Sequence, residues 1–143
     1  MSVKQISVSL ENVPGMFLRV SECLGDEGIN IRGLSVADTS DISTVRFVVD
    51  VPEKAANVLR SLGYSVKETD AIAVEVPDHP GGIQAVLKPL REANINVLYL
   101  YPYLGRGESG QPIIIVGVDR TEEAIKVLKK NWVYTFGNEI YTL

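Results

Sequence analysis

The chain has 143 residues, of which 45% are hydrophobic and 22% charged, a composition typical of one ordinary folded domain or two very small ones. A net charge of −4 argues against nucleic-acid binding, because phosphate contacts need clustered basic residues, and the single cysteine excludes an intrachain disulfide and a cysteine-based zinc site. No apolar run reaches the ~20 residues that a membrane span needs. We therefore expect a cytoplasmic protein without a metal, a cofactor, a nucleic-acid partner or a membrane partner.

The first half of the chain predicts four strands and two helices. Alternating apolar and polar residues indicate strands, and apolar residues at a spacing of three or four indicate helices. The second helix opens with a proline, which suits a first helical position. In chain order we predict a strand at 5–10, a helix after Pro14 and Gly15, strands at 29–37 and 43–51, a helix at 52–63 and a strand at 64–69.

The second half repeats this order. A shift of 66 positions places Pro14 on Pro80, Gly15 on Gly81 and Asn30 on Asn96. The offset then grows by three at an expected turn, where insertions are tolerated, so that the chain contains a two-unit internal repeat. In chain order we predict a strand at 71–76, a helix after Pro80 and Gly81, strands at 95–103 and 112–119, a helix at 121–131 and a strand at 138–143.

The order strand, helix, strand, strand, helix, strand is the split βαβ pattern. It predicts an α+β fold of two ferredoxin-like βαββαβ units in tandem, each an antiparallel sheet with both helices on one face. We place one domain at residues 1–69 and the other at 70–143. Because a unit of ~70 residues has a thin core, we expect the two units to pack together around a pseudo-twofold axis.

Two matching segments carry a resemblance to a known family. They are ENVPGMFLRVSECLGDEGINIRGL and PDHPGGIQAVLKPLREANINVLYL, and together the two repeats cover essentially the whole chain. Each resembles the ACT domain, a small regulatory module that binds amino acids and controls metabolic enzymes. The resemblance implies two ACT-like domains and a non-catalytic protein that binds a free amino acid. It also implies a homo-oligomer, a dimer by expectation, with any regulated enzyme in another chain.

The two Pro-Gly loops are the candidate ligand sites. Gly15 and Gly81 lack a Cβ, and the unpaired amides of a helix start suit a carboxylate. In ACT pairs this loop commonly faces the second strand of the other unit, which implies one composite site of residues 12–16 with Asn96 and another of residues 78–83 with Asn30. The implied ligand-binding residues are Asn12, Val13, Pro14, Gly15, Met16, Asn30, Ile31, Asp78, His79, Pro80, Gly81, Gly82, Ile83, Asn96 and Val97.

The two loops differ in charge and in bulk. Asp78 stands where the first loop has Asn12, and Gly82 stands where it has Met16. An aspartate facing the ligand would attract an ammonium group and repel a carboxylate. We therefore expect two unequal sites, with the first loop the better carboxylate site.

Three further features lie outside these loops. Pro89 replaces Cys23 in the second repeat and is expected to end or kink its helix. The glycine-rich residues 105–111 predict a flexible hairpin connection that could close over a ligand. Three alternating tyrosines are expected to share one face of a strand, as core, interface or pocket lining: Tyr99, Tyr101 and Tyr103.

Other interpretations stay open at this point. The Pro-Gly pairs could be ordinary strand-to-helix turns, and Asn30 and Asn96 could cap strands or form local turns. His79 with Asp78 could serve a small enzyme on a ferredoxin-like scaffold or hold a metal, although no partner constellation accompanies them. A third alternative is a regulatory subunit of a branched-chain amino-acid enzyme, because the small subunit of acetohydroxyacid synthase resembles one such unit, joined there to a different C-terminal domain.

Overall fold

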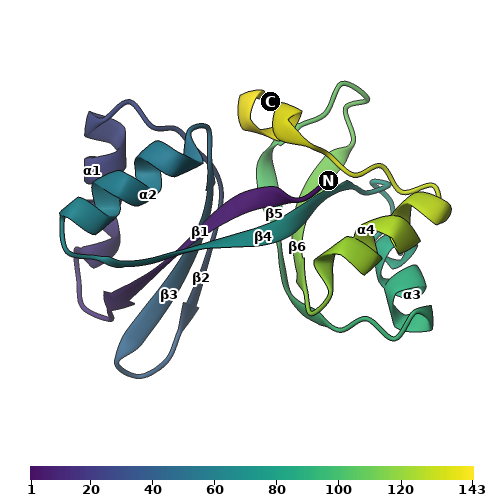
Figure 1. Ribbon diagram of the computed structural model, residues 1–143, viewed down its shortest axis with the longest axis horizontal. Helices are drawn as coiled ribbons and strands as arrows, with labels where there is room; N and C mark the ends of the chain where they lie inside the picture. Colours follow the sequence, from purple (N-terminus) through teal and green to yellow (C-terminus); the bar gives the residue numbers. More distant parts are fainter. The chain divides into compact units, whose positions relative to one another are not determined.

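The computed structural model describes residues 1–143 and shows an α+β fold with six strands, four α-helices and one short 3-10 helix (Figure 1). The chain divides into two compact units. The N-terminal unit comprises Lys4–Thr69, and the C-terminal unit comprises Asp70–Leu143 together with Met1–Val3. None of the helices is both long enough and apolar enough to span a membrane.

The N-terminal unit has the strand order that the split βαβ pattern predicts. Its elements are β1 (Val3–Glu11), α1 (Met16–Asp26), β2 (Ile31–Asp38), β3 (Ile42–Val49), α2 (Pro52–Ser61) and the first residues of β4 (Ser65–Glu75). Strand β3 lies between β1 and β2 and is antiparallel to both, with Val45 opposite Val8 on one side and Val36 on the other. Figure 1 shows both helices on the same side of these strands.

The core of this unit lies between that face of the sheet and the two helices. Alternate residues of the strands point into it, and the helices contribute buried side chains four positions apart, such as Val20 and Leu24 of α1. The buried members of the core are Ile6, Val8, Leu10, Val20, Leu24, Ile29, Val45, Phe47, Val49, Ala55, Ala56 and Leu59.

The C-terminal unit repeats this arrangement. Its elements are the rest of β4, α3 (Gln84–Glu92), β5 (Val97–Arg106), β6 (Pro112–Val118), α4 (Thr121–Lys130) and the 3-10 helix η1 (Asn138–Thr142). Strand β6 lies between β4 and β5, antiparallel to both, and Val116 is opposite Ile72 and Leu100. Its core pairs the strand residues with buried residues of α3 and α4, among them Leu90 and Leu128.

Strand β4 differs from its prediction. The expected strands at 64–69 and 71–76 are one continuous strand, Ser65–Glu75, which serves as the last strand of the first repeat and the first strand of the second. Only Asp70 lies between the two predictions, and this single residue, without a Gly or Pro beside it, does not interrupt the strand. The two repeats are therefore joined without a linker, and the chain has six named strands rather than eight.

The strand predicted at 138–143 is wrong, because those residues form η1 and its end. Residues 134–136 take the place beside β4 instead, through one β-bridge and two backbone hydrogen bonds of 3.1 and 2.8 Å to residues 73–75. The internal repeat does indicate the correct position of the pairing segment. The offset of 69 that holds in the second helices places residues 133–138 on 64–69, so that the pairing segment lies a few residues before the predicted strand.

The hairpin and the tyrosines follow their predictions. Residues 105–111 hold the connection between β5 and β6, closed by a hydrogen bond from the Gly110 N–H to the Gly107 carbonyl at 2.9 Å. The rings of Tyr99 and Tyr101 stack at 6.3 Å on one face, and the Tyr99 ring covers Gly117, where an added Cβ would lie 2.1 Å from the ring. The hairpin's proposed closure over a ligand stays a prediction.

Pro89 was predicted to end or kink its helix, and the helix does not end there. Helix α3 continues three residues further, to Glu92, and the Pro89 carbonyl accepts a hydrogen bond from the Ala93 N–H at 3.1 Å. Because proline has no N–H, the carbonyl of Ala85 loses its partner four residues on. The proline ring is buried, so packing offsets part of the cost of the missing bond.

Pro89 and Cys23 occupy the same position of the two repeats. Removing the proline from α3 and introducing one into α1 should change the free energy of unfolding in opposite directions. An interior proline costs a helix about 3 kcal/mol, and the buried ring methylenes return about 0.8 kcal/mol each. We expect Pro89→Ala to raise the free energy of unfolding by about 1 kcal/mol and Cys23→Pro to lower it by about 3 kcal/mol. Urea denaturation measures both, and a loss of stability in Pro89→Ala would show that α3 depends on the proline.

Gly82 is the position with the least room for a side chain. A Cβ there would lie 2.0 Å from the Pro77 carbonyl oxygen, so that Gly82→Ala must displace backbone. We expect this variant to lose about 3 kcal/mol of unfolding free energy. Gly25→Ala in α1 is the matched control: its Cβ meets nothing within 4 Å, and it should stabilise by about 0.5–1 kcal/mol. Equal effects in thermal melts would contradict the tight loop.

Candidate functional site

The first Pro-Gly loop connects β1 to α1 and is anchored to the β2–β3 hairpin. Gly15 caps the helix with a φ of 86°, a left-handed conformation that favours glycine, and the space around it is open. The Asn12 N–H donates to the Asp41 carbonyl at 3.0 Å, and its side-chain Nδ2 donates to the Thr39 carbonyl at 3.3 Å. These bonds hold the loop in place and leave the Asn12 side-chain oxygen without a partner.

The first turn of α1 has free backbone donors. The Arg19 N–H donates to the Gly15 carbonyl at 3.0 Å, but the N–H groups of Phe17 and Leu18 have no hydrogen-bond partner. No acidic side chain occupies this turn. Two free amides at the positive end of the helix dipole form an arrangement that can accept a carboxylate.

The second Pro-Gly loop uses its donors internally. The N–H groups of Gly82, Gln84 and Ala85 each donate to a carbonyl three residues earlier, at 2.9, 3.0 and 3.1 Å. Helix α3 accordingly begins at Gln84, two positions later in the repeat than α1 does. Of the two amides that are free in the first loop, the counterpart of Leu18, Gln84, is therefore bonded in the second loop, whereas the counterpart of Phe17, Ile83, is free there too.

The charged residues of the second loop are exposed and do not form a catalytic pair. The Asp78 carboxylate forms an ion pair with Arg106 at 3.9 Å, and its N–H donates to the Gln111 side-chain oxygen at 3.2 Å. The His79 Nδ1 lies 3.0 Å from the Pro80 carbonyl oxygen rather than facing Asp78. Arg106 thus offsets part of the negative charge that distinguishes this loop.

Asn30 of the first repeat and Asn96 of the second form the same pair of hydrogen bonds with an aspartate. The Asn30 N–H donates to the Asp50 carboxylate at 3.0 Å, and the Asp50 N–H returns a bond to the Asn30 carbonyl at 3.1 Å. Asn96 and Asp119 form the same pair of bonds, at 3.1 and 3.2 Å. The backbone at each asparagine is therefore tied to an aspartate, while both side-chain amides are exposed and unbonded. The aspartates were missed as partners, although the repeat aligns them.

No single unit assembles a complete predicted site. In the N-terminal unit the loop at residues 12–16 lies at the start of α1, and Asn30 and Ile31 lie beyond its end. That helix has 11 residues and is about 16 Å long. The second repeat separates residues 78–83 from Asn96 and Val97 in the same way, by α3. The pairing of a loop with the asparagine of the other repeat stays a prediction.

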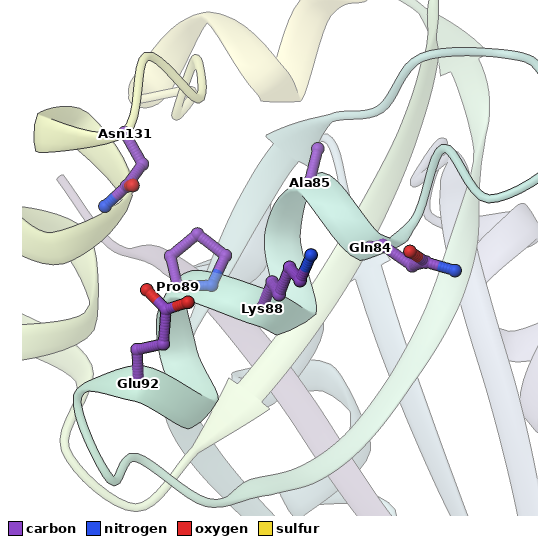
Figure 2. Close-up of a pocket in the computed structure, with 6 residues that line it drawn as sticks. All are labelled: Gln84, Ala85, Lys88, Pro89, Glu92 and Asn131. Carbon is purple, nitrogen blue, oxygen red and sulfur yellow. The ribbon is translucent and has the colours of Figure 1, made fainter.

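Two hollows of the C-terminal unit contain none of the predicted site residues. Figure 2 shows the first, of about 380 Å³, where Asn131 at the end of α4 lies across from the Pro89 ring of α3. The remaining residues that line it are Gln84, Ala85, Lys88 and Glu92. The second, of about 330 Å³, is lined by Glu75, Glu108, Ser109, Tyr134, Phe136, Glu139 and Leu143. Each hollow is lined by residues that lie far apart in the sequence, so no local motif predicts either hollow.

A hydrogen bond from the Tyr134 hydroxyl to the Glu139 carboxylate, at 3.1 Å, crosses the second hollow. This bond raises the pKa of Tyr134, and the negative charge of Glu139 adds to the effect. The backbone N–H groups of Gly137 and Glu139 lower the pKa of the Glu139 carboxyl, so that it is ionised at neutral pH.

Comparison with solved structures gives close matches over the whole chain. Protein BT0572 from Bacteroides thetaiotaomicron is 28% identical, with a TM-score of 0.91 over 100% of this chain and 98% of that one. The regulatory subunits of aspartate kinase from Thermus thermophilus and Thermus flavus are 14% and 15% identical, with TM-scores of 0.63 and 0.61, each over 90% of this chain and 92% of its own. At that identity the Thermus proteins show a shared fold alone. Among curated proteins none matches this chain in sequence.

A family model described as an ACT domain pair matches residues 1–142. The match spans both repeats, both Pro-Gly loops and the continuous strand between them. It agrees with the resemblance carried by the two Pro-Gly segments and with the strand order in each unit. The chain therefore belongs to the ACT domain pair family.

Proposed function

We propose that this chain is a regulatory module that binds a free amino acid and signals its presence to an oligomer or a partner enzyme. The observation that carries the proposal is the pair of free amides, Phe17 and Leu18, beside the open left-handed Gly15 of an ACT pair chain. The ligand's α-carboxylate accepts hydrogen bonds from these amides. The free oxygen of Asn12 is available for the ligand's ammonium group.

Asn96 of the other repeat completes this site in the proposal, because its side-chain amide is exposed and has no partner. A ligand that contacts both repeats stabilises the arrangement in which they meet by its differential affinity for that arrangement. The same linkage transmits the ligand's presence to whatever docks on the pair, and the chain itself performs no chemistry.

The two sites differ in the proposal. The second loop uses the N–H groups of Gly82, Gln84 and Ala85 internally, which leaves one free amide where the first loop has two, and it carries Asp78 next to the position where a carboxylate would enter. Residues 12–16 with Asn96 therefore form the tight site, and residues 78–83 with Asn30 form a weak one.

The proposed partner is a second copy of the chain or an enzyme of amino-acid biosynthesis. The Thermus proteins of this fold are regulatory subunits of aspartate kinase, and the match covers 92% of each of them. An acetohydroxyacid synthase partner remains the second candidate of the same kind, and co-purification with a large synthase subunit distinguishes it. Nothing favours an enzyme built on His79 and Asp78, since both side chains are exposed and they do not face each other.

A thermal-shift screen against the twenty amino acids tests the proposal. A ligand at 100 times its dissociation constant stabilises the chain by about 2.7 kcal/mol, and the melting temperature should rise with its concentration. The amide derivative of the best ligand, which lacks the carboxylate, is the matched control and should give no shift. Absence of a shift with all twenty amino acids would contradict the proposal.

Exchange of the loop residues tests the inequality of the sites. Asn12→Asp places a carboxylate in the first loop and should weaken binding by about 1 kcal/mol, or roughly fivefold, whereas Asp78→Asn should leave the tight site unchanged. Asn12→Ala is the control for the lost bond to Thr39. Titration calorimetry measures all three, and two identical sites per chain would refute the assignment.

A further inference from the structure

Three glutamates from three different elements line the 330 Å³ cavity of the C-terminal unit. Glu75 ends β4, Glu108 lies in the β5–β6 hairpin, and Glu139 lies in η1. None of the three carboxylates forms an ion pair with a Lys or Arg side chain within 4.0 Å, although the charge of the N-terminal ammonium acts on Glu139. The side chains that line the cavity therefore include three carboxylates and no Lys or Arg.

Two aromatic rings form adjoining walls of the same cavity. Tyr134 and Phe136 lie edge to face, with their centroids 4.8 Å apart and their planes at 81°. Phe136 is buried, and an added Cβ at Gly107 would lie 3.1 Å from its ring, whereas Tyr134 is 54% exposed. One ring is thus fixed by packing, and the other offers aromatic surface to a ligand.

The backbone explains why these side chains meet. Residues 134–136 pair with β4 through the bridge between Thr135 and Val74, and Val74 belongs to the core under α3 and α4. Because side chains alternate along a strand, Tyr134, Phe136 and Glu75 point to the opposite face. The carboxylate and both rings therefore share the side of the sheet away from the helices.

The electrostatics agree with this geometry. The hydrogen bond to Glu139 is the main cause that raises the pKa of Tyr134, and the charges of Glu75 and Glu108 raise it further. All three carboxylates therefore act on one hydroxyl at the cavity wall. Backbone N–H groups lower the pKa of Glu139 itself, which keeps that carboxylate charged.

The ligand that fits is an organic cation. No group of three acidic, histidine or cysteine side chains in the chain could hold a metal ion, whereas carboxylates spread around two aromatic rings suit an ammonium group, which is attracted to both. We propose that this cavity binds a primary alkylammonium group, the chemistry of an aliphatic diamine or of a lysine side chain. This goes beyond the proposed function, since such a ligand needs no carboxylate and the cavity uses neither Pro-Gly loop.

The first repeat lacks these features. The repeat offsets place Ser9 on Glu75, Ser65 on Tyr134 and Lys67 on Phe136. One acid and both rings are therefore replaced by two hydroxyls and a cation, a combination that would repel an ammonium group. The site belongs to the second repeat alone.

Titration with 1,5-diaminopentane and with Nα-acetyl-lysine methylamide, followed by amide NMR shifts, tests the proposal in the full chain. We expect saturable shifts at the amides of residues 134–139 with one probe or both. Shifts from the diamine alone identify a free amine as the ligand, and shifts from the lysine derivative identify a lysine side chain. Each exposed carboxylate contributes roughly two- to fivefold in affinity, so Glu75→Gln with Glu139→Gln should weaken binding about 5- to 20-fold.

A matched pair of exposed glutamates outside the cavity, Glu22→Gln with Glu53→Gln, removes the same charge and should leave the affinity unchanged. Tyr134→Leu keeps all carboxylates and should weaken binding about two- to fivefold through loss of the ring. Asn12→Asp should have no effect, which separates this site from the amino-acid site. The proposal is overturned if neither probe shifts residues 134–139, or if the control pair weakens binding as much as the cavity pair does.

Discussion

Strand β4 is the constraint on which both units depend, because one uninterrupted backbone supplies a strand to each. Its side chains alternate with a period of two, so that residues an even number apart belong to the same alternate set. Val66 packs against the core of the N-terminal unit, while Ile72 and Val74 are buried in the core of the C-terminal unit. The even-numbered side chains of β4 thus contribute to both cores. An inserted or deleted residue within the strand would turn the even-numbered side chains beyond it away from their core.

The same repeated motif has two different local structures in the two Pro-Gly loops. In the second loop Gly82 leaves room for the Pro77 carbonyl, where a Cβ would clash, and the N–H groups of Gly82, Gln84 and Ala85 bond within the loop. In the first loop Met16 stands at the aligned position, the helix begins sooner, and two amides remain free. The first loop therefore has two free donors at its helix start, and the second loop has one. The smaller number of donors in the second loop disfavours a carboxylate ligand there, as does the presence of Asp78 in place of Asn12.

The second repeat has also acquired features at its end that the first lacks. Where β4 continues the first repeat, residues 134–136 form only a short bridge, and the chain then turns at the buried Gly137 into η1. That turn brings Glu139 back toward Tyr134, and the Tyr103 hydroxyl donates a hydrogen bond to the Ile140 carbonyl. The short bridge and the turn into η1 thus place Tyr134, Phe136 and Glu139 in the walls of the cavity.

The sequence by itself determined the elements whose periodicity is strong and repeated: the two-unit repeat, the α+β class, the strand and helix order, the two Pro-Gly loops and the family. These follow from local patterns that the chain states twice. Tertiary structure alone decided the fusion of two strands into β4, the continuation of α3 past a buried Pro89, the engagement of Asp50 and Asp119 with the asparagine backbones, and the meeting of Glu75, Glu108 and Glu139. The physical reason is that each of these depends on which neighbour satisfies a backbone group or covers a side chain. The three glutamates of the cavity are 31 or more positions apart, and no local spacing encodes their meeting.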